Sequence, residues 1–296
     1  MKVAILGPGA VGGFLAALFW KNNIIVECIA KPETVAVIKK NGLVIKSKIF
    51  GNFTAWPSAA EKLTAPTDII FITVKANFIK EALKRLDPAL SQNSIIIPLL
   101  NGLAHINILK SNYGVNAIAG TIGALEVFQD DAGVINHIST GGKIEIASDN
   151  QKIKARLNEV KDLISKIGLG VEILNTEAQV IWHKLIRLNA IACATAATDK
   201  PIGVLRTDPI WRPKIQAAVS EAVAVAKREG AVMDTQEIMN QIDKVQPEQL
   251  SSLQRDVSQG KPSEVEAIPG AIVEKCAAYK LKCPIISELY QLIKAR

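Results

Sequence analysis

One lysine of this chain lies where its neighbours predict an apolar residue. The stretch VIWHKLIRLNAIACATAA (residues 180–197) repeats apolar residues at helical spacing, and Lys184 falls inside that apolar stripe. Burying an ammonium group costs several kcal/mol unless a partner compensates, so the position indicates a chemical use. A lysine in a cleft can donate a proton to a reacting oxygen and stabilise the developing negative charge. The alternative is that the long side chain reaches solvent from the helix edge.

A second chemical pattern lies near the start of the chain. The stretch AILGPGAVGG places Gly7, Gly9 and Gly12 in a GxGxxG pattern, with Ala10 and Val11 between them, directly after a predicted strand and at the start of a predicted helix. Glycines at this spacing allow a tight turn, backbone approach to a pyrophosphate, and close packing of the helix on the strand. The helix N-terminus supplies N–H donors to the diphosphate. The pattern therefore predicts a dinucleotide site formed by these five residues.

The tip of the second predicted strand indicates which dinucleotide binds. A carboxylate at this place holds the ribose 2′-hydroxyl of NAD, whereas a cation favours the 2′-phosphate of NADP. The strand IIVECIA ends just before Lys31, and Glu27 falls in the middle of the strand rather than at its end. The sequence therefore predicts NADP(H) as the cofactor, with Lys31 near the 2′-phosphate. The alternative for Lys31 is a solvated loop lysine.

Polar residues follow two further predicted strands. Lys75 comes directly after FITV, and Asn101 comes directly after IIPLL. Open α/β sheets bind ligands outside the carboxyl ends of their strands, so both side chains are predicted to lie at the cofactor or substrate site. The alternative for each is an ordinary polar residue at a strand end.

The elements that carry these residues fall into two parts. Up to about residue 175, short β-branched runs alternate with helical stretches, which predicts a parallel, doubly wound sheet of Rossmann type, finished by later strands without intervening helices. After GVEILNT helical periodicity dominates, with a helix start at Asp208 and Pro209 and a helix stop at Gly230. The predicted fold class is α/β, with an NADP-binding Rossmann domain at residues 1–175 and an all-α substrate and catalytic domain at residues 176–296.

Composition limits the partners and the location. The formal net charge is +7, but the Lys and Arg residues are spread singly, which favours anionic small molecules over nucleic acid. The longest apolar runs are too short to span a bilayer and the N-terminus lacks the features of a secretory signal, which predicts a soluble, cytoplasmic protein. The four cysteines are predicted to be reduced and to hold no metal, although the nearest pair, Cys276 and Cys283, could meet on one helix face.

Taken in order, these motifs resemble those of the ketopantoate reductase (2-dehydropantoate 2-reductase) family, within the 6-phosphogluconate-dehydrogenase-like group. The family pattern joins GxGxxG, a VK after a later strand, an NG after the next strand, a W-x-K-L helix, and SSM…D…G-[RK]-x-T-E-[IV]-[DE] near the end. The residues that match this pattern are Gly7, Gly9, Gly12, Lys75, Asn101, Gly102, Trp182, Lys184, Leu185, Ser251, Ser252, Asp256, Gly260, Lys261, Glu264, Val265 and Glu266.

The resemblance implies an activity and a role for each site residue. In this family the lysine matching Lys184 protonates the ketone oxygen of a 2-oxo acid as the nicotinamide delivers hydride to the adjacent carbon. The residue matching Glu264 binds the substrate hydroxyl and orients the lysine, and the one matching Ser252 contacts the substrate carboxylate. Asn101 is implied to bind substrate or nicotinamide ribose, with Lys75 beside both. The alternatives are an exposed helix acid at position 264 and a helix cap at position 252.

The helix that carries Lys184 departs from the family pattern. Asparagines are expected four and eight residues after the lysine, on the same face, where this chain has Leu188 and Ala192. Asn189 is rotated by about 140° from Lys184 unless a π-bulge turns it back, whereas Thr195 returns to the lysine's face and is predicted to be a polar substrate contact. The pocket is therefore predicted to be drier around position 188 than in the family.

Together these observations predict NADPH-dependent reduction of a 2-oxo acid, with 2-dehydropantoate as the leading substrate and pantothenate biosynthesis as the pathway. Two alternatives stay open: a related reductase of another branched or apolar 2-oxo acid, and an NADP(H)-binding sensor without turnover. An opine-forming or 3-hydroxyacid dehydrogenase-like activity fits the stretch GKPSEVEAI less well. The expected partner is a small-molecule 2-oxo acid, with no nucleic acid and no membrane, and the chain is either a monomer or a homodimer.

Overall fold

The computed structural model describes residues 1–296, with the side chain of Ala104 excepted. The chain forms two compact units. The first consists of Met1–Leu100 and His105–Val180, and the second of Asn101–Ala104 and Ile181–Arg296. No helix in the described part of the chain combines the length and the apolar character that crossing a membrane requires.

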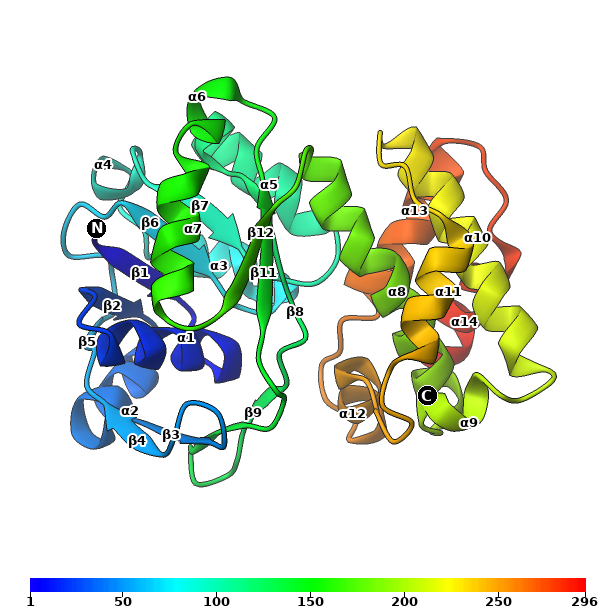
Figure 1. Cartoon of the computed structure of the whole chain (residues 1–296), viewed down its shortest axis with the longest axis horizontal. Coiled ribbons are helices and arrows are strands. Elements are labelled where there is room, and N and C mark those ends of the chain that lie inside the picture. The colour runs from blue at the N-terminus through cyan, green and yellow to red at the C-terminus, as the bar shows by residue number, and fades with distance from the viewer. The chain divides into compact units, whose positions relative to one another are not determined.

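A five-stranded parallel sheet organises the first unit (Figure 1), in the order β5-β2-β1-β6-β7. Its strands are β1 (Val3–Leu6), β2 (Val26–Ile29), β5 (Ser58–Ala60), β6 (Ile69–Ile72) and β7 (Ile95–Pro98). Strands β1, β6 and β7 are buried along their whole length, which explains their uninterrupted apolar sequences. Because the chain crosses from one side of β1 to the other between β5 and β6, the carboxyl ends of β1 and β6 mark the place where such sheets bind ligands. The predicted parallel, doubly wound sheet is confirmed.

The sequence predicts that the later strands finish this sheet. They form two further sheets instead. The first has the order β4-β3-β10-β9 and the second the order β12-β11-β8. Both contain antiparallel pairs, β10 with β9 and β11 with β8. The short link between β9 and β10 leaves no room for a crossover helix. Their bounds are β3 (Leu43–Ser47), β4 (Phe53–Ala55), β8 (Ala119–Gly123), β9 (Val127–Gln129), β10 (Ile135–His137), β11 (Lys143–Ala147) and β12 (Gly170–Ile173).

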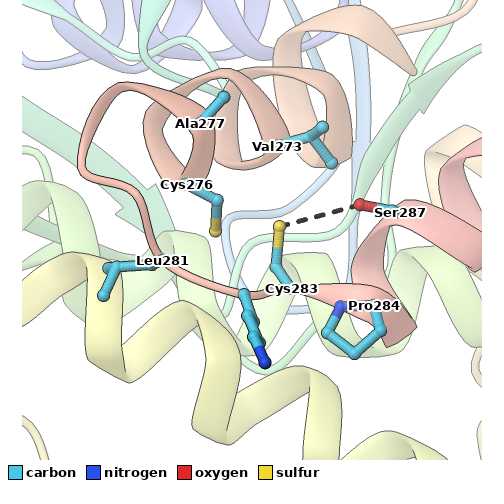
Figure 2. Close-up of a pocket in the computed structure, with 8 residues that line it drawn as sticks. Val273, Cys276, Ala277, Leu281, Cys283, Pro284 and Ser287 are labelled. Carbon is cyan, nitrogen blue, oxygen red and sulfur yellow. Dashed lines mark hydrogen bonds between the residues drawn. The ribbon is translucent and has the colours of Figure 1, made fainter.

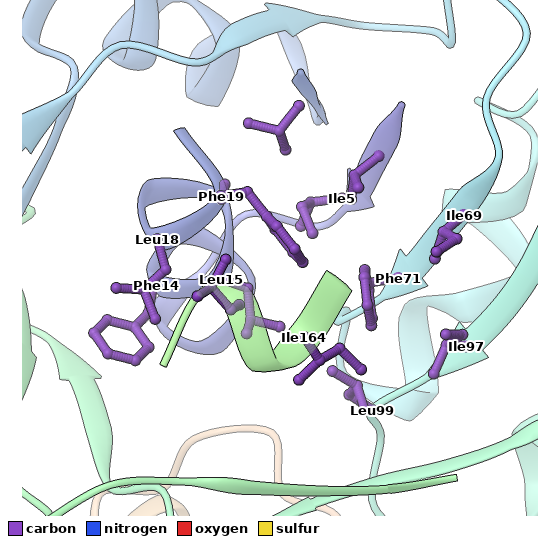
Figure 3. Close-up of a cluster of buried hydrophobic side chains, with 14 of the residues drawn as sticks. Ile5, Phe14, Leu15, Leu18, Phe19, Ile69, Phe71, Ile97, Leu99 and Ile164 are labelled. Atoms are coloured by element: carbon purple, nitrogen blue, oxygen red, sulfur yellow. The ribbon is translucent and has the colours of Figure 1, made fainter. Parts of the chain in front are cut away.

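Helix α1 supplies much of the core of the first unit. Figure 3 shows Phe19 of α1 beside Ile5 of β1 and Phe71 of β6, and the rings of Phe19 and Phe71 lie 5.6 Å apart. Phe14 and Leu15 are likewise fully buried. This packing holds the N-terminus of α1 directly beyond the end of β1. The helices of this unit are α1 (Ala10–Lys21), α2 (Pro32–Asn41), the 3₁₀-helix η1 (Ala76–Phe78), α3 (Ile79–Leu83), α4 (Pro88–Ser91), α5 (Ala104–Tyr113), the 3₁₀-helix η2 (Gly114–Asn116), α6 (Gln151–Lys154) and α7 (Leu157–Lys166).

In the second unit, the described residues form helices and no strands, which confirms the predicted all-α part. The carboxylate of Asp208 accepts hydrogen bonds from the backbone N–H groups of Ile210 and Trp211, so α10 begins where the sequence predicts a start. Gly230 has φ +85 just beyond the end of that helix. The helical segments are α8 (Glu177–Thr198), α9 (Ile202–Leu205), α10 (Trp211–Arg228), α11 (Thr235–Asp243), α12 (Ser252–Ser258), the π-helix η3 (Glu266–Gly270), α13 (Ala271–Ala278) and α14 (Pro284–Lys294).

Candidate functional site

The turn between β1 and α1 can be built only with glycine at two of its positions. Gly7 has φ +91, and a Cβ there would lie 2.4 Å from Cγ1 of Val74. A Cβ on Gly12 would lie 2.2 Å from Oγ1 of Thr73 and 2.5 Å from the carbonyl oxygen of Gly7. The first glycine of the pattern therefore allows the tight turn, and the third allows close packing of the helix on the strand, as predicted.

Gly9 has a different reason to be glycine. A Cβ at this exposed position would meet no described atom within 4 Å, so packing does not require its absence. No side chain caps the N-terminus of α1, which leaves the N–H groups of Ala10 and Val11 without a side-chain acceptor at this end. An open approach to uncapped helix N–H groups fits a diphosphate, since anions bind at such ends. The glycine turn thus fits the pyrophosphate of a dinucleotide.

Thr73, a residue that the sequence analysis passed over, ties β6 to this turn. Its hydroxyl donates to the carbonyl oxygen of Gly7 at 2.8 Å and to that of Leu6 at 3.2 Å. The hydroxyl occupies the space that a side chain at Gly12 would take. A threonine inside a predicted buried strand and two residues before Lys75 is a weak signal, which explains why the sequence alone did not reveal it.

Two predicted cofactor lysines lie beyond the carboxyl ends of strands in the first unit. Lys31, exposed, comes two residues after β2, and its ammonium lies 5.7 Å from the ring centre of Phe78. Lys75, also exposed, precedes η1, which contains that phenylalanine. Glu27 lies in the middle of β2, as predicted, and its carboxylate accepts hydrogen bonds from the hydroxyl and backbone N–H of Thr64. The tip of β2 is therefore followed by a cation, and this carboxylate is already hydrogen-bonded in the middle of the strand.

In the second unit, the amide of Asn101 donates a hydrogen bond to the Glu264 carboxylate at 2.8 Å. The next residue, Gly102, has φ +83, and a Cβ there would lie 2.0 Å from the carbonyl oxygen of Ala267. The Glu264 carbonyl in turn accepts from the N–H groups of Ala267 and Ile268, where the chain enters η3. Two residues that the family resemblance implies at the substrate site are thus brought together, with a glycine packed against the π-helix beside them.

Lys184 lies half-buried on α8, which runs as an unbroken α-helix. The π-bulge that would turn Asn189 toward the lysine's face does not occur in this helix; the π-helical turn is η3 instead. Asn189 is completely buried, its carbonyl oxygen accepts from the thiol of Cys193 at 3.3 Å, and its Nδ2 has no hydrogen-bond partner among the described residues. The amide therefore does not replace the asparagine missing at Leu188.

The serine pair and Thr195 occupy different environments. Ser251, not Ser252, caps α12, because its hydroxyl accepts from the N–H of Gln254 at 3.0 Å. The capping alternative for Ser252 is wrong, and that side chain is exposed. Thr195 is completely buried, with its hydroxyl 2.9 Å from that of Ser251 and donating to the carbonyl of Ile191. Substrate contacts by Ser252 and Thr195 stay predictions, and the buried hydroxyl of Thr195 is already hydrogen-bonded.

His137, which the sequence analysis left outside the catalytic set, belongs to the core of the first unit. Its ring stacks on Phe14 at 4.8 Å, and its Nδ1 lies 2.8 Å from the hydroxyl of Ser47. Within the residues that the structure describes, no three His, Cys, Asp or Glu side chains gather in a way that could hold a metal ion.

Comparisons with known proteins match both parts of the chain. Residues 3–151 match the family model described as ketopantoate reductase PanE/ApbA, and residues 178–296 match the model of its C-terminal part. The chain is 26% identical to the uncharacterized oxidoreductase YkpB of Bacillus subtilis, over 98% of this chain and 97% of that one.

Solved structures resemble it over nearly its whole length. A PanE/ApbA family ketopantoate reductase from Ralstonia eutropha is 25% identical with a TM-score of 0.88, over 100% of this chain and 98% of that chain. D-mandelate dehydrogenase, solved with NADH and anilino(oxo)acetate, has a TM-score of 0.91 at 20% identity, over 100% of this chain and 98% of that chain. The second likeness shows a shared fold.

Proposed function

Because the chain belongs to the ketopantoate reductase family and is thus an oxidoreductase of that family, we propose that it reduces a 2-oxo acid to the 2-hydroxy acid with NADPH. The leading substrate is 2-dehydropantoate, which places the reaction in pantothenate biosynthesis. The observation that carries the proposal is the hydrogen bond from Asn101 to Glu264, since it joins two polar groups with the chemistry to hold a hydroxylated 2-oxo acid. The predicted cytoplasmic location remains an expectation beside it, and the choice between monomer and homodimer stays open.

The residues of the first unit hold the cofactor in this proposal. The backbone of the glycine turn and the N-terminus of α1 bind the diphosphate, and Lys31 binds the 2′-phosphate. Lys75 lies beyond the end of β6, where parallel sheets bind their ligands, and supplies a second positive charge. When bound, the nicotinamide would supply a hydride to the carbonyl carbon of the substrate.

The residues of the second unit handle the substrate. Lys184 donates a proton to the carbonyl oxygen as that oxygen gains charge, which removes the cost of forming a free alkoxide. Glu264 accepts a hydrogen bond from the substrate hydroxyl, Asn101 keeps that carboxylate oriented, and Ser252 binds the substrate carboxylate. Thr195 has the weakest support among the predicted contacts because its side chain is fully buried.

The test is steady-state kinetics on a panel of 2-oxo acids, with NADPH and NADH compared at each substrate. We expect turnover with NADPH and the highest kcat/KM for 2-dehydropantoate. The lowest kcat/KM for 2-dehydropantoate would overturn the substrate assignment, and NADPH binding without turnover on any 2-oxo acid would favour the sensor.

A second candidate keeps the reaction and changes the substrate to another branched or apolar 2-oxo acid. It is favoured by Leu188 and Ala192, one and two turns beyond Lys184 on the same helix, which offer no amide to a substrate hydroxyl. Leu188→Asn separates the two candidates. If the native substrate is apolar, this variant shifts the ratio of kcat/KM values toward 2-dehydropantoate; if 2-dehydropantoate is native, its kcat/KM does not rise.

A further inference from the structure

Two cysteines of the second unit meet at the joint between α13 and α14. Cys276 lies in the last turns of α13, and Cys283 is the residue from which α14 starts. Their spacing suggested that they could meet on one helix face. They lie on two helices instead, because a turn separates them. The N–H of Leu281 donates to the carbonyl of Cys276 at 2.8 Å, and Lys280 adopts φ +54 between them. This left-handed turn ends α13 and sends the chain back, so that Cys283 returns to the side of Cys276.

The two sulfur atoms point toward one another at a small pocket (Figure 2). The pocket is lined by both cysteines and by apolar side chains such as Val273, Leu281 and Pro284. The Cys283 sulfur also lies 3.7 Å from the hydroxyl of Ser287. Cys276 is 1% exposed and Cys283 is 8% exposed, so Cys283 is the more accessible residue of the pair.

The surroundings of Cys276 disfavour its thiolate. Burial, the neighbouring Cys283 and the carboxylate of Glu221 together raise the pKa of Cys276. The same carboxylate accepts hydrogen bonds from the N–H groups of Ile285 and Ile286, so it also occupies the anion-favouring end of α14. The Cys276 thiolate is therefore a poor leaving group, and a disulfide that contains it resists reduction at this sulfur.

We propose that Cys276 and Cys283 form a modification site, where a small-molecule disulfide oxidises them to an intramolecular disulfide that ties α13 to α14. The Cys283 sulfur attacks one sulfur of the oxidant, forms a mixed disulfide and releases the first small thiol. The Cys276 sulfur then attacks the Cys283 sulfur and releases the second. Two electrons pass from the cysteines to the oxidant, and the two cysteine protons end on the released thiols.

The test uses the full chain, incubated with oxidised glutathione under native conditions and mapped by mass spectrometry without reduction. Trypsin cuts after Lys280 and Lys282, between the two cysteines, so only a disulfide keeps their peptides together. We expect one cross-linked pair, with a mass lower by two hydrogen atoms, and the loss of two titratable thiols. Any of three results would overturn the proposal: four titratable thiols after oxidation, a glutathione that stays on Cys283, or a cross-link to another cysteine.

Matched variants separate the pair from the other thiols. Cys28→Ala removes a fully buried cysteine of the first unit and should leave the cross-link unchanged. Cys276→Ala and Cys283→Ala should each abolish it. Oxidation should raise the Tm of the wild-type chain and of Cys28→Ala, since a cross-link restricts the unfolded state, but not the Tm of either pair variant. An equal shift in all of them would count against the site. The readout needs neither substrate nor cofactor and is independent of the proposed reaction.

Discussion

The amide of Asn101 donates a 2.8 Å hydrogen bond to the carboxylate of Glu264, which lies 163 residues later in the chain. A hydrogen bond to a charged acceptor contributes more than one between neutral groups, and it holds the carboxylate in one orientation. Glu264 is not part of a helix, since it lies in the bend before η3. The orientation of its carboxylate therefore depends on a residue distant in sequence.

A double-mutant cycle on this pair tests their coupling. In the proposed reaction, Asn101→Ala should lower kcat/KM by about tenfold and Glu264→Gln by about tenfold to a hundredfold. The double variant should lose less than the product of the two, because residues in contact are not additive. Steady-state kinetics on the best 2-oxo acid measures all three. Independent, multiplicative effects would show that Asn101 does not act through Glu264.

Replacement of Lys184 tests the proton donor. Lys184→Ala should lower kcat by about 10² to 10⁴-fold, the range that general acid catalysis contributes, while the Kd for NADPH stays unchanged. Lys200→Ala, which alters an exposed lysine just beyond the end of the same helix, serves as the matched control and should retain wild-type kcat. Full turnover by Lys184→Ala would remove this lysine from the mechanism.

Reversal of charge at Lys31 tests the cofactor assignment. Lys31→Asp should reduce the preference for NADPH over NADH by about tenfold to a hundredfold, since it replaces a partner of the 2′-phosphate with a carboxylate. Lys39→Asp makes the same charge change at an exposed position of α2, the helix that follows Lys31. It should leave the preference for NADPH over NADH unaltered. Titration of both cofactors by fluorescence checks the result, and equal ratios in the two variants would contradict it.

A pair of glycine substitutions tests the packing beside Glu264. Gly102 and Gly51 both have positive φ, at +83 and +78, but only a Cβ on Gly102 would collide with Ala267. Each alanine variant should lose about 1 to 2 kcal/mol of unfolding free energy from backbone strain alone. Gly102→Ala should lose about 1 to 3 kcal/mol more through overpacking, and kcat should fall with it. Urea unfolding compares the two, and equal losses would exclude the steric effect.

Acid should weaken an ion pair between α10 and α13. Burial alone raises the pKa of Glu229, but hydrogen bonds from Lys275 and Tyr279 outweigh it and hold that pKa below the ordinary value of 4.5. A depressed folded-state pKa adds stability above the unfolded-state value and loses it as the pH falls through the folded-state value. Glu229→Gln should therefore show a shallower loss of stability below about pH 4.5 than the wild type.

Urea midpoints measured from about pH 7 to about pH 3 give this comparison. Glu248→Gln, at an exposed position of the same unit, is the control and should follow the wild-type curve. A Glu229→Gln curve parallel to the wild type throughout would show that the pair contributes nothing to the acid response.

Local sequence patterns predicted much of the fold. Glycine spacing, β-branched runs and helical periodicity each depend on neighbours within a few residues, so they predict the turn at Gly7, the parallel strands and the helices beyond residue 180. The short strands β3, β4 and β5 lack a long apolar run and were not predicted. β3 pairs with β10 and β5 pairs with β2, strands that lie far away in the sequence and that no local window contains.

At the candidate site, the sequence by itself determined which residue types were available: the glycine turn, Lys31, Lys184 and Glu264. Tertiary structure decided which of them meet. The packing of distant elements decides three features of the site: Ser251 rather than Ser252 caps α12, Asn189 stays buried, and Asn101 holds Glu264. Side-chain periodicity assigns a residue to a face of its own helix or strand, but the partner across that face is chosen only when the elements come together, which is why spacing alone did not reveal these contacts.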